Sequence, residues 1–209
     1  MLNYDKDEML KRLSALPHQG RIAFIAICVQ RMMPLYEEYY RRSGDGSPES
    51  VKNGLDIVWS IVRGEPISKN HILNTLHHTK KLALDEDIYP DAIGNDVVFG
   101  VCYGLECGMT GDVKLSEYPA RMAFDLLYQY IYSKNNPGLS TMTSKEVERT
   151  IADPLIQVEL QRQRRDILEL TKISQQNGNY SENADNLRKQ AISEDFSVIA
   201  TNWPRYSKD

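Results

Sequence analysis

A run of apolar residues near the N-terminus dominates the hydrophobic pattern of the chain. It lies inside the stretch RIAFIAICVQRMMPLYEEYY, residues 21–40, and no side chain from Ile22 to Val29 is polar. A helix that is apolar on every face is buried on every face. The run is far shorter than the roughly 20 residues that a membrane-spanning helix needs. The pattern therefore predicts the central, buried helix of an all-α protein.

Three residues of this stretch are unusual in a buried helix. Pro34 removes a backbone N–H and crowds the carbonyl of Gln30, so it is expected to kink or break the helix. Arg21 and Arg31 flank the apolar run. If they are buried with it, each needs an acidic partner. If they lie at the helix ends, each reaches water along its aliphatic stem.

Apolar residues recur at helical spacing in eight further segments, several of them bounded by start and stop signals. Ser47 followed by Pro48 is typical of a helix N-terminus, and Thr143 with Glu146 matches a capping box. The Gly-rich segment 92–109 is ambiguous between strand and helix, and a helix is favoured because no other segment supplies a strand partner. The predicted segments are 5–16, 49–63, 69–84, 92–109, 116–134, 143–152, 155–175 and 181–192.

These segments predict an all-α fold for the whole chain. Connections are short and none resembles a domain linker, so residues 1–209 are expected to form a single compact multihelical bundle of about eight or nine helices. The helix at 155–175 is expected to pack against the central helix at 21–40. A short C-terminal tail is expected from about residue 196.

Composition narrows the classes of protein that fit. The 209 residues carry a formal charge of −4, which argues against a general nucleic-acid binder because such proteins show a basic face. Three cysteines are too few and too irregular for a disulfide framework or a zinc site. The N-terminus has charges where a signal peptide would be apolar, and no window approaches a membrane span. We expect a cytoplasmic protein with no membrane partner.

Two groups of residues suggest metal binding and fail on spacing. His71, His77 and His78 lie on one predicted helix, but no two are four residues apart and no acid lies between them. The acidic segment DEDIYPD at residues 85–91 has Pro90 where a calcium loop needs a glycine. We expect a solvated helix face and a solvated acidic turn, and no metal or cofactor.

Two acids lie among apolar neighbours inside predicted helices. Asp56 and Glu159 could neutralise Arg21 and Arg31 within the helical core, and this ion-pair interpretation is the preferred one. The alternative is that the carboxylates line an open pocket and act as general acid and base.

Several groups of residues, spread over nearly the whole chain, share the pattern of a known family. The groups are Leu16-Pro17, Arg21, Ala23-Phe24, Arg31-Met32-Met33-Pro34 and Tyr36, then Leu55-Asp56 with Trp59, Pro90-Asp91, Pro154-Leu155 with Glu159 and Gln163, and finally Leu187-Arg188, Ala191 and Ser197. Together they resemble a bacterial family catalogued as domain of unknown function 416. That family usually has a glutamate before the arginine of the central helix, where this chain has Gln30. The resemblance implies a compact multihelical fold and no particular activity.

The functional expectation follows by elimination. A compact acidic helical protein without a catalytic constellation is typical of a non-enzymatic protein-binding module, for example an immunity-type protein that neutralises a basic toxin or enzyme domain. The alternative is an enzyme of unknown reaction that uses the buried helix carboxylates. The expected contact surface is the acidic turn, with an aromatic anchor, although a merely solvated loop has the same composition. Its residues are Asp85, Glu86, Asp87, Tyr89 and Asp91.

Overall fold

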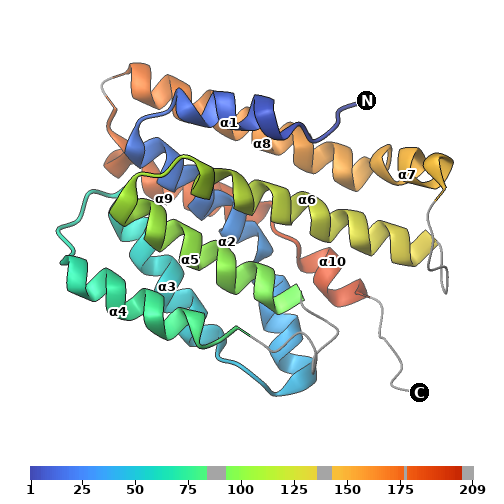
Figure 1. Cartoon of the computed structure of the whole chain (residues 1–209), viewed down its shortest axis with the longest axis horizontal. Coiled ribbons are helices and arrows are strands. Elements are labelled where there is room, and N and C mark those ends of the chain that lie inside the picture. Colours follow the sequence, from blue (N-terminus) through green and yellow to red (C-terminus); the bar gives the residue numbers. More distant parts are fainter. Residues whose placement is uncertain (84–92, 136–142, 177, 204–209) are drawn as a thin grey trace.

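Ten helices and no strand make up the part of the chain that the structure describes. The computed structural model describes residues 1–83, 93–135, 143–176 and 178–203 (Figure 1). Nine of the helices have eight or more residues and the tenth has six, which confirms the predicted all-α class. The helices are α1 (Lys6–Ser14), α2 (His18–Ser43), α3 (Pro48–Val62), α4 (Lys69–Lys80), α5 (Ile93–Thr110), α6 (Lys114–Asn135), α7 (Ser144–Ile151), α8 (Pro154–Gln175), α9 (Tyr180–Ser193) and α10 (Ser197–Asn202).

Helix α2 lies at the centre of the bundle. It packs against α3, α5, α6, α8, α9 and α10, and Figure 1 shows the other helices arranged around it. Every side chain from Ile22 to Val29 is buried, as the apolar run predicted. The prediction that residues 155–175 pack against this helix is also correct, because α8 covers part of it.

The Gly-rich segment that could have been a strand is helix α5. Its glycines allow a close approach to α2 and α3. A Cβ atom built on Gly100 would lie 2.7 Å from a methyl group of Val29 of α2, and one on Gly104 would lie 2.9 Å from Val58 of α3. Only a residue without a side chain fits at such distances. The helix prediction for this segment is therefore confirmed, and its glycines serve the close packing of α5 against α2 and α3.

Pro34 does not break α2, which continues from His18 to Ser43. A proline inside a helix removes one internal hydrogen bond and pushes apart the carbonyls of the preceding turn. One carbonyl of that turn, on Arg31, accepts a hydrogen bond at 2.9 Å from the backbone N–H of Phe196. The proline therefore coincides with the point where another part of the chain is attached to α2. The predicted break is wrong, and the predicted kink stays a prediction.

Local capping explains where several helices begin. The side chain of Ser47 accepts from the N–H of Ser50 at the start of α3, and Thr143 and Glu146 form the reciprocal capping box of α7. Each such cap contributes about 1 kcal/mol. The structure differs from the sequence prediction at the C-terminus, where residues 197–202 form α10 instead of a tail. The N-cap position of α10 is Phe196, which has no capping side chain, and the N–H of Ser197 is instead bound by Asp195 at 3.0 Å, so the usual N-cap signal is missing.

Helix α10 is held by tertiary contacts at both ends. Its first turn follows the Phe196–Arg31 hydrogen bond, and the ring of Trp203 packs on Tyr130 of α6 with centroids 5.6 Å apart. The Arg42 guanidinium, on the last turn of α2, donates to the carbonyls of Ala200 and Trp203 at 3.4 and 3.2 Å. The six residues are therefore helical because of where they are attached.

Tryptophan emission tests the burial of Trp59, whose side chain is 0% exposed, as predicted. Removing the other tryptophan by Trp203→Phe leaves Trp59 as the sole indole, and its emission should stay blue-shifted in the folded protein because no water reaches the ring. The same protein in concentrated urea provides the control. Emission like that of free indole before unfolding would contradict the buried position.

The acid limb of the stability profile tests the cluster at the end of α2. Hydrogen bonds from Arg41, and then from Arg42, lower the pKa of Glu38 to about 2 from its ordinary 4.5. Since the folded pKa lies below the unfolded one, Glu38 stabilises the fold above pH 4.5 and loses this effect as the pH falls towards 2. Glu38→Gln should cost up to about 1 kcal/mol in urea melts near neutral pH.

That cost should vanish near the acid end of the same pH window. Glu37→Gln is the matched control, because Glu37 is the exposed neighbour of Glu38 and makes no ion pair with the described residues. A cost for Glu38→Gln that persists unchanged at the acid end would show that the carboxylate charge is not what stabilises the cluster.

Candidate functional site

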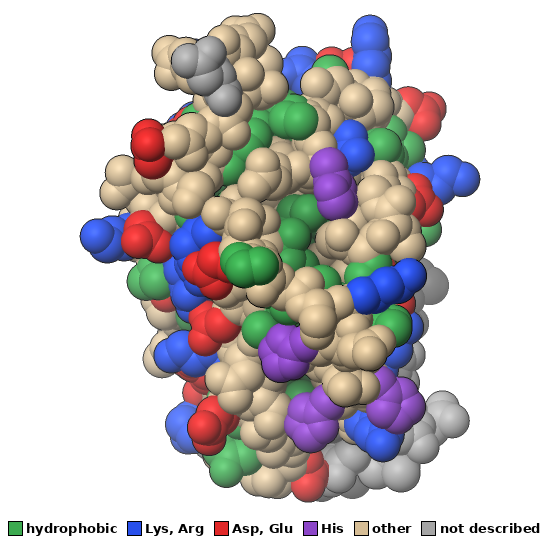
Figure 2. Space-filling model, turned by 90° about the vertical axis from the view of Figure 1, so that its left-hand side faces the viewer, with side chains coloured by type: hydrophobic (Ala, Val, Ile, Leu, Met, Phe, Trp, Pro, Cys, Tyr) green, Lys and Arg blue, Asp and Glu red, His purple; other side chains and the backbone are tan. Residues whose placement is uncertain are grey.

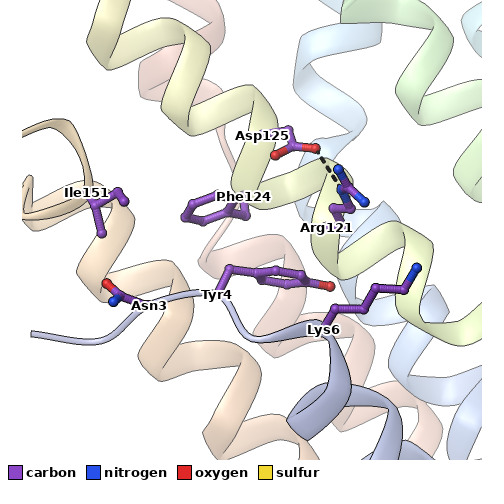
Figure 3. Close-up of a pocket in the computed structure, with 7 residues that line it drawn as sticks. All are labelled: Asn3, Tyr4, Lys6, Arg121, Phe124, Asp125 and Ile151. Carbon is purple, nitrogen blue, oxygen red and sulfur yellow. Dashed lines mark hydrogen bonds and ion pairs between the residues drawn. The ribbon is translucent and has the colours of Figure 1, made fainter. Parts of the chain in front are cut away.

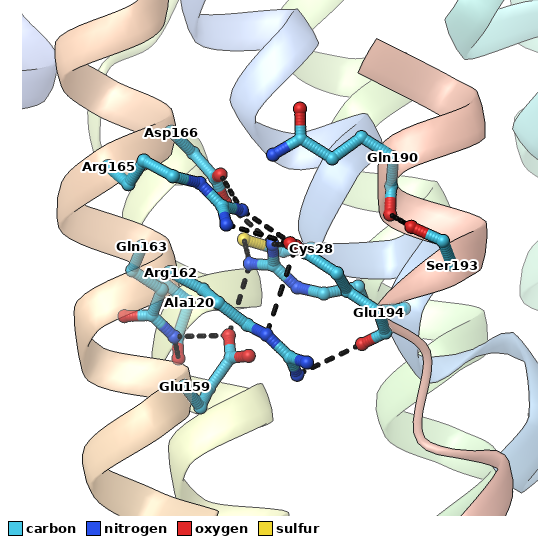
Figure 4. A network of polar contacts seen from close by, with 11 residues as sticks. Cys28, Ala120, Glu159, Arg162, Gln163, Arg165, Asp166, Gln190, Ser193 and Glu194 are labelled. Atoms are coloured by element: carbon cyan, nitrogen blue, oxygen red, sulfur yellow. Dashed lines mark hydrogen bonds and ion pairs between the residues drawn. The ribbon is translucent and has the colours of Figure 1, made fainter. Parts of the chain in front are cut away.

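A network of buried charges joins α2 to α8 (Figure 4). The Arg31 side chain of α2 is 0% exposed and donates to the Asp166 carboxylate at 2.6 Å and to the Glu159 carboxylate at 3.1 Å. Both acids belong to α8 and are at most 3% exposed. They are seven residues apart, which is close to two helical turns, so they lie on the same face of α8 and both reach Arg31.

A second layer of charges extends the network towards solvent at the end of α9. The Glu194 carboxylate lies 3.9 Å from the Arg31 guanidinium and accepts from Arg165 at 2.6 and 2.7 Å. Arg165 also donates to Asp166 at 2.9 Å, and Arg162 donates to the backbone carbonyl of Glu194 at 3.0 Å. Three arginines thus face three acids, so the formal charge of the network is zero when all are ionised.

Within this network Glu159 is the acid that burial affects most. One of its oxygens accepts from Arg31 and from the amide of Gln163, which lies at 3.0 Å, and the other has no hydrogen-bond partner among the described residues. Burial raises the pKa of Glu159 above its ordinary value, and the attraction of Arg31 opposes this only in part. Burial also raises the pKa of the neighbouring Cys28 thiol, which makes it unreactive as a nucleophile.

The structure brings Arg31 and Glu159 together and leaves the other two proposed ion-pair residues elsewhere. Arg21 makes no ion pair with an acid among the described residues. Its guanidinium donates to the carbonyls of Leu16 and Gly111 at 2.7 and 3.3 Å, and these residues follow α1 and α5. Asp56 is 43% exposed and pairs with Arg188 of α9. Arg21 and Asp56 therefore take no part in the buried ion pairs that were expected for them. Arg21 binds backbone carbonyls, and Asp56 pairs with Arg188.

Arg188 also organises the surroundings of Gln30, the position where the family usually has a glutamate. The Gln30 side-chain oxygen accepts from Arg188 at 3.1 Å and from the indole N–H of Trp59 at 3.2 Å. The Arg188 guanidinium lies 6.0 Å from the centre of the Trp59 ring, within cation–π range. A neutral amide fits here because Asp56 already supplies a negative partner for Arg188.

Four residues of the network, Arg162, Arg165, Asp166 and Glu194, were not singled out from the sequence. Asp166 lies in α8 on the same face as Leu160, Ile167 and Leu170, and an acid on an apolar face was the available signal. Arg188, which lies outside this network, was named only as part of the family pattern, and its pairing had no local signal because its partner Asp56 is 132 residues away. Its pairing depends on how α9 packs beside α3.

A separate hollow lies between the N-terminal segment and α6 (Figure 3). It has a volume of about 440 Å³ and is open to solvent. A second cavity of about 30 Å³ lies against the same N-terminal residues and is lined in part by Gln163. Neither hollow is lined by Asp56 or Glu159. The residues around the larger one are Asn3, Tyr4, Lys6, Arg121, Phe124, Asp125 and Ile151.

The remaining expectations concern metals and the acidic turn. His71, His77 and His78 are exposed on α4, on the side of the molecule that Figure 2 shows. In the described parts of the chain, no three His, Cys, Asp or Glu residues are grouped so that they could hold a metal ion. None of the helices described is long and apolar enough to cross a membrane. Asp85, Glu86, Asp87, Tyr89 and Asp91 lie outside the described residues.

The protein is thus an all-α bundle in its described residues, built around the buried helix α2 and an internal arginine–carboxylate network. A family model described as "Protein of unknown function (DUF416)" matches residues 8–201. The chain belongs to this family.

The fold recurs in a solved structure. A crystal structure of a DUF416 family protein from Shewanella baltica OS155 is similar to this chain with a TM-score of 0.73 and 17% sequence identity. The similarity covers 88% of this chain and 93% of that one. No curated protein matches the chain.

A double-mutant cycle tests the buried network. Arg31→Met should cost about 3–5 kcal/mol in urea melts, because it leaves the buried Glu159 carboxylate without its cation and Asp166 with Arg165 alone. Glu159→Gln should cost less, since burial already favours the neutral form of this acid. The double variant should cost less than the sum of the two singles. Strict additivity would show that the two side chains do not interact.

Proposed function

We propose that this chain is a non-enzymatic binding module that acts by contacting another protein. The observation that supports this most is the enclosure of the chain's buried acids. Glu159 is 1% exposed and Asp166 is 3% exposed, and both carboxylates are engaged by Arg31. A general acid or base must come within hydrogen-bond reach of a substrate proton. These carboxylates hold helices together instead.

The enzyme alternative requires the same acids to line an open pocket. Asp56 is open to solvent, but it is tied to Arg188 and borders neither of the two hollows beside the N-terminal segment. Glu159 is closed off by α2 and α8. The alternative therefore has only the raised pKa of Glu159 in its favour, and structural ion-pair networks raise such values as well.

The contact surface that we propose is the acidic segment 85–91, which follows α4 and precedes α5. It combines four acids, Asp85, Glu86, Asp87 and Asp91, with the aromatic Tyr89. Concentrated negative charge favours a basic partner, and an aromatic side chain is a common energetic anchor in interfaces. An immunity-type protein that covers a basic toxin or enzyme domain is one partner relationship of this kind. A cytoplasmic location goes with this proposal.

Affinity capture from the source cell tests the proposal, with the proteins encoded by neighbouring reading frames as the first candidates. A captured partner should lose affinity for the double variant Asp87→Lys with Tyr89→Ala, and more strongly at low salt, because charge attraction is screened by ions. Glu148→Lys, an exposed charge reversal on α7, is the matched control and should bind normally.

Two outcomes would contradict the proposed protein-binding function or its contact surface. A partner whose affinity is equal for the acidic-turn variant and the Glu148→Lys control would contradict the surface. A shift of the melting temperature by a metabolite that is then chemically converted would favour the enzyme instead.

A further inference from the structure

The hollow beside the N-terminal segment has two chemically different ends (Figure 3). The rings of Tyr4 and Phe124 are stacked with centroids 5.4 Å apart and lie in its middle. Lys6 and Arg121 lie together at one end, and Ile151 lies at the other. A ligand in this hollow would therefore meet two cations at one end, with the Asp125 carboxylate beside Arg121, then the two aromatic rings, and at the other end Ile151 together with the polar side chain of Asn3.

The walls of the hollow are held in place without a ligand. The side-chain amide of Gln157 accepts from the N–H of Leu2 at 2.7 Å and donates to its carbonyl at 2.8 Å. The Tyr4 hydroxyl donates to the buried Glu117 carboxylate at 2.7 Å. The N-terminal segment is thus fixed to α6 and α8, and a preorganised site loses less conformational entropy on binding.

The charge in the hollow is only partly balanced from within. The Nε of Arg121 donates to the Asp125 carboxylate at 3.3 Å, and both side chains are about half exposed. Lys6 is exposed, and no carboxylate of the described residues lies within ion-pair distance of its ammonium. The carboxylate of Glu117, which accepts from the Tyr4 hydroxyl, is buried and does not line the hollow. Of the two cations that line the hollow, Lys6 is therefore the one without an ion-pair partner among the described residues.

We propose that this hollow binds a small organic carboxylate with an apolar body. The carboxylate contacts Lys6 and Arg121, and the body lies over Phe124 and towards Ile151. The volume of about 440 Å³ falls within the range of roughly 300–1,000 Å³ that is common for small-molecule sites. The apolar body is an alkyl chain or an aromatic ring, since both would bury against stacked rings.

This site is separate from the acidic segment proposed as a protein-binding surface. Asn3, Tyr4 and Lys6 precede the residues 8–201 that match the family model, so one wall of the hollow comes from outside the matched region. The remaining wall comes from α6 and α7. Binding here and binding at residues 85–91 can therefore fail independently.

Titration of the ¹⁵N-labelled full chain in two-dimensional NMR spectra tests the proposal. The ligands are phenylacetate and hexanoate, with phenylacetamide as the neutral match and acetate as the match without an apolar body. We expect phenylacetate or hexanoate to shift the resonances of residues around the hollow with a Kd of about 1 mM or below. Phenylacetamide and acetate should bind at least about fivefold more weakly.

Variants locate the binding. Lys6→Gln should weaken binding of the carboxylate about two- to fivefold. Arg121→Gln should weaken it more, because it also leaves the Asp125 charge facing the ligand. Lys11→Gln, an exposed lysine on α1 away from the hollow, is the control and should bind as the natural sequence does. All three positions are exposed or half exposed, so the variants should fold, and thermal melts verify this.

Three results would overturn the proposal. The first is the absence of shifts around the hollow for both phenylacetate and hexanoate at about 10 mM. The second is equal binding of phenylacetamide, which would remove the carboxylate from the recognition. The third is unchanged affinity in both Lys6→Gln and Arg121→Gln. Binding of only the alkyl or only the aromatic carboxylate supports the proposal and identifies the body that the site prefers.

Discussion

The burial of one positive charge determines how this bundle closes. Arg31 lies two residues after the apolar run of α2, and its side chain is 0% exposed. An arginine cannot lose its proton there, so the surrounding helices must supply negative charge at hydrogen-bond distance. Asp166 and Glu159 of α8 do so. The rotation of α8 about its axis is thereby fixed, because only one face of that helix carries both acids.

The same charge also relates α2 to the C-terminal part of the chain. Glu194, at the end of α9, closes the network from outside, and two residues later Phe196 binds the carbonyl of Arg31. The side chain and the backbone carbonyl of Arg31 are thus both bound by residues that lie more than 100 positions further along the chain. Replacing such a network by apolar residues is often neutral for stability, whereas removing one partner leaves an uncompensated buried charge and is strongly destabilising.

How far the sequence could predict this structure depends on the range of the interactions involved. The buried stretch of α2 from Ile22 to Val29 and the capping box of α7 were predictable, because each follows from residues within a few positions of one another. The Arg31–Glu159 contact could be proposed, since few buried acids were available. The pairing of Asp56 with Arg188 and the helix α10 could not, because they depend on contacts across more than 130 residues. The hollow at the N-terminal segment was equally inaccessible, since its walls come from the two sides of a tertiary contact.

The attachment of the chain's N-terminus has a consequence for how freely it can vary. Gln157 binds Leu2 through the backbone N–H and carbonyl alone, with one amide group acting as a neighbouring β-strand would. Such a contact does not read the side chain at position 2. Substitutions there should keep both hydrogen bonds as long as residue 2 keeps its N–H, so a proline is the exception, but they change the packing of a partly buried side chain against the core. The two hydrogen bonds therefore tolerate a change of residue 2, and the apolar packing of Leu2 restricts that change to side chains that still fit beside the core.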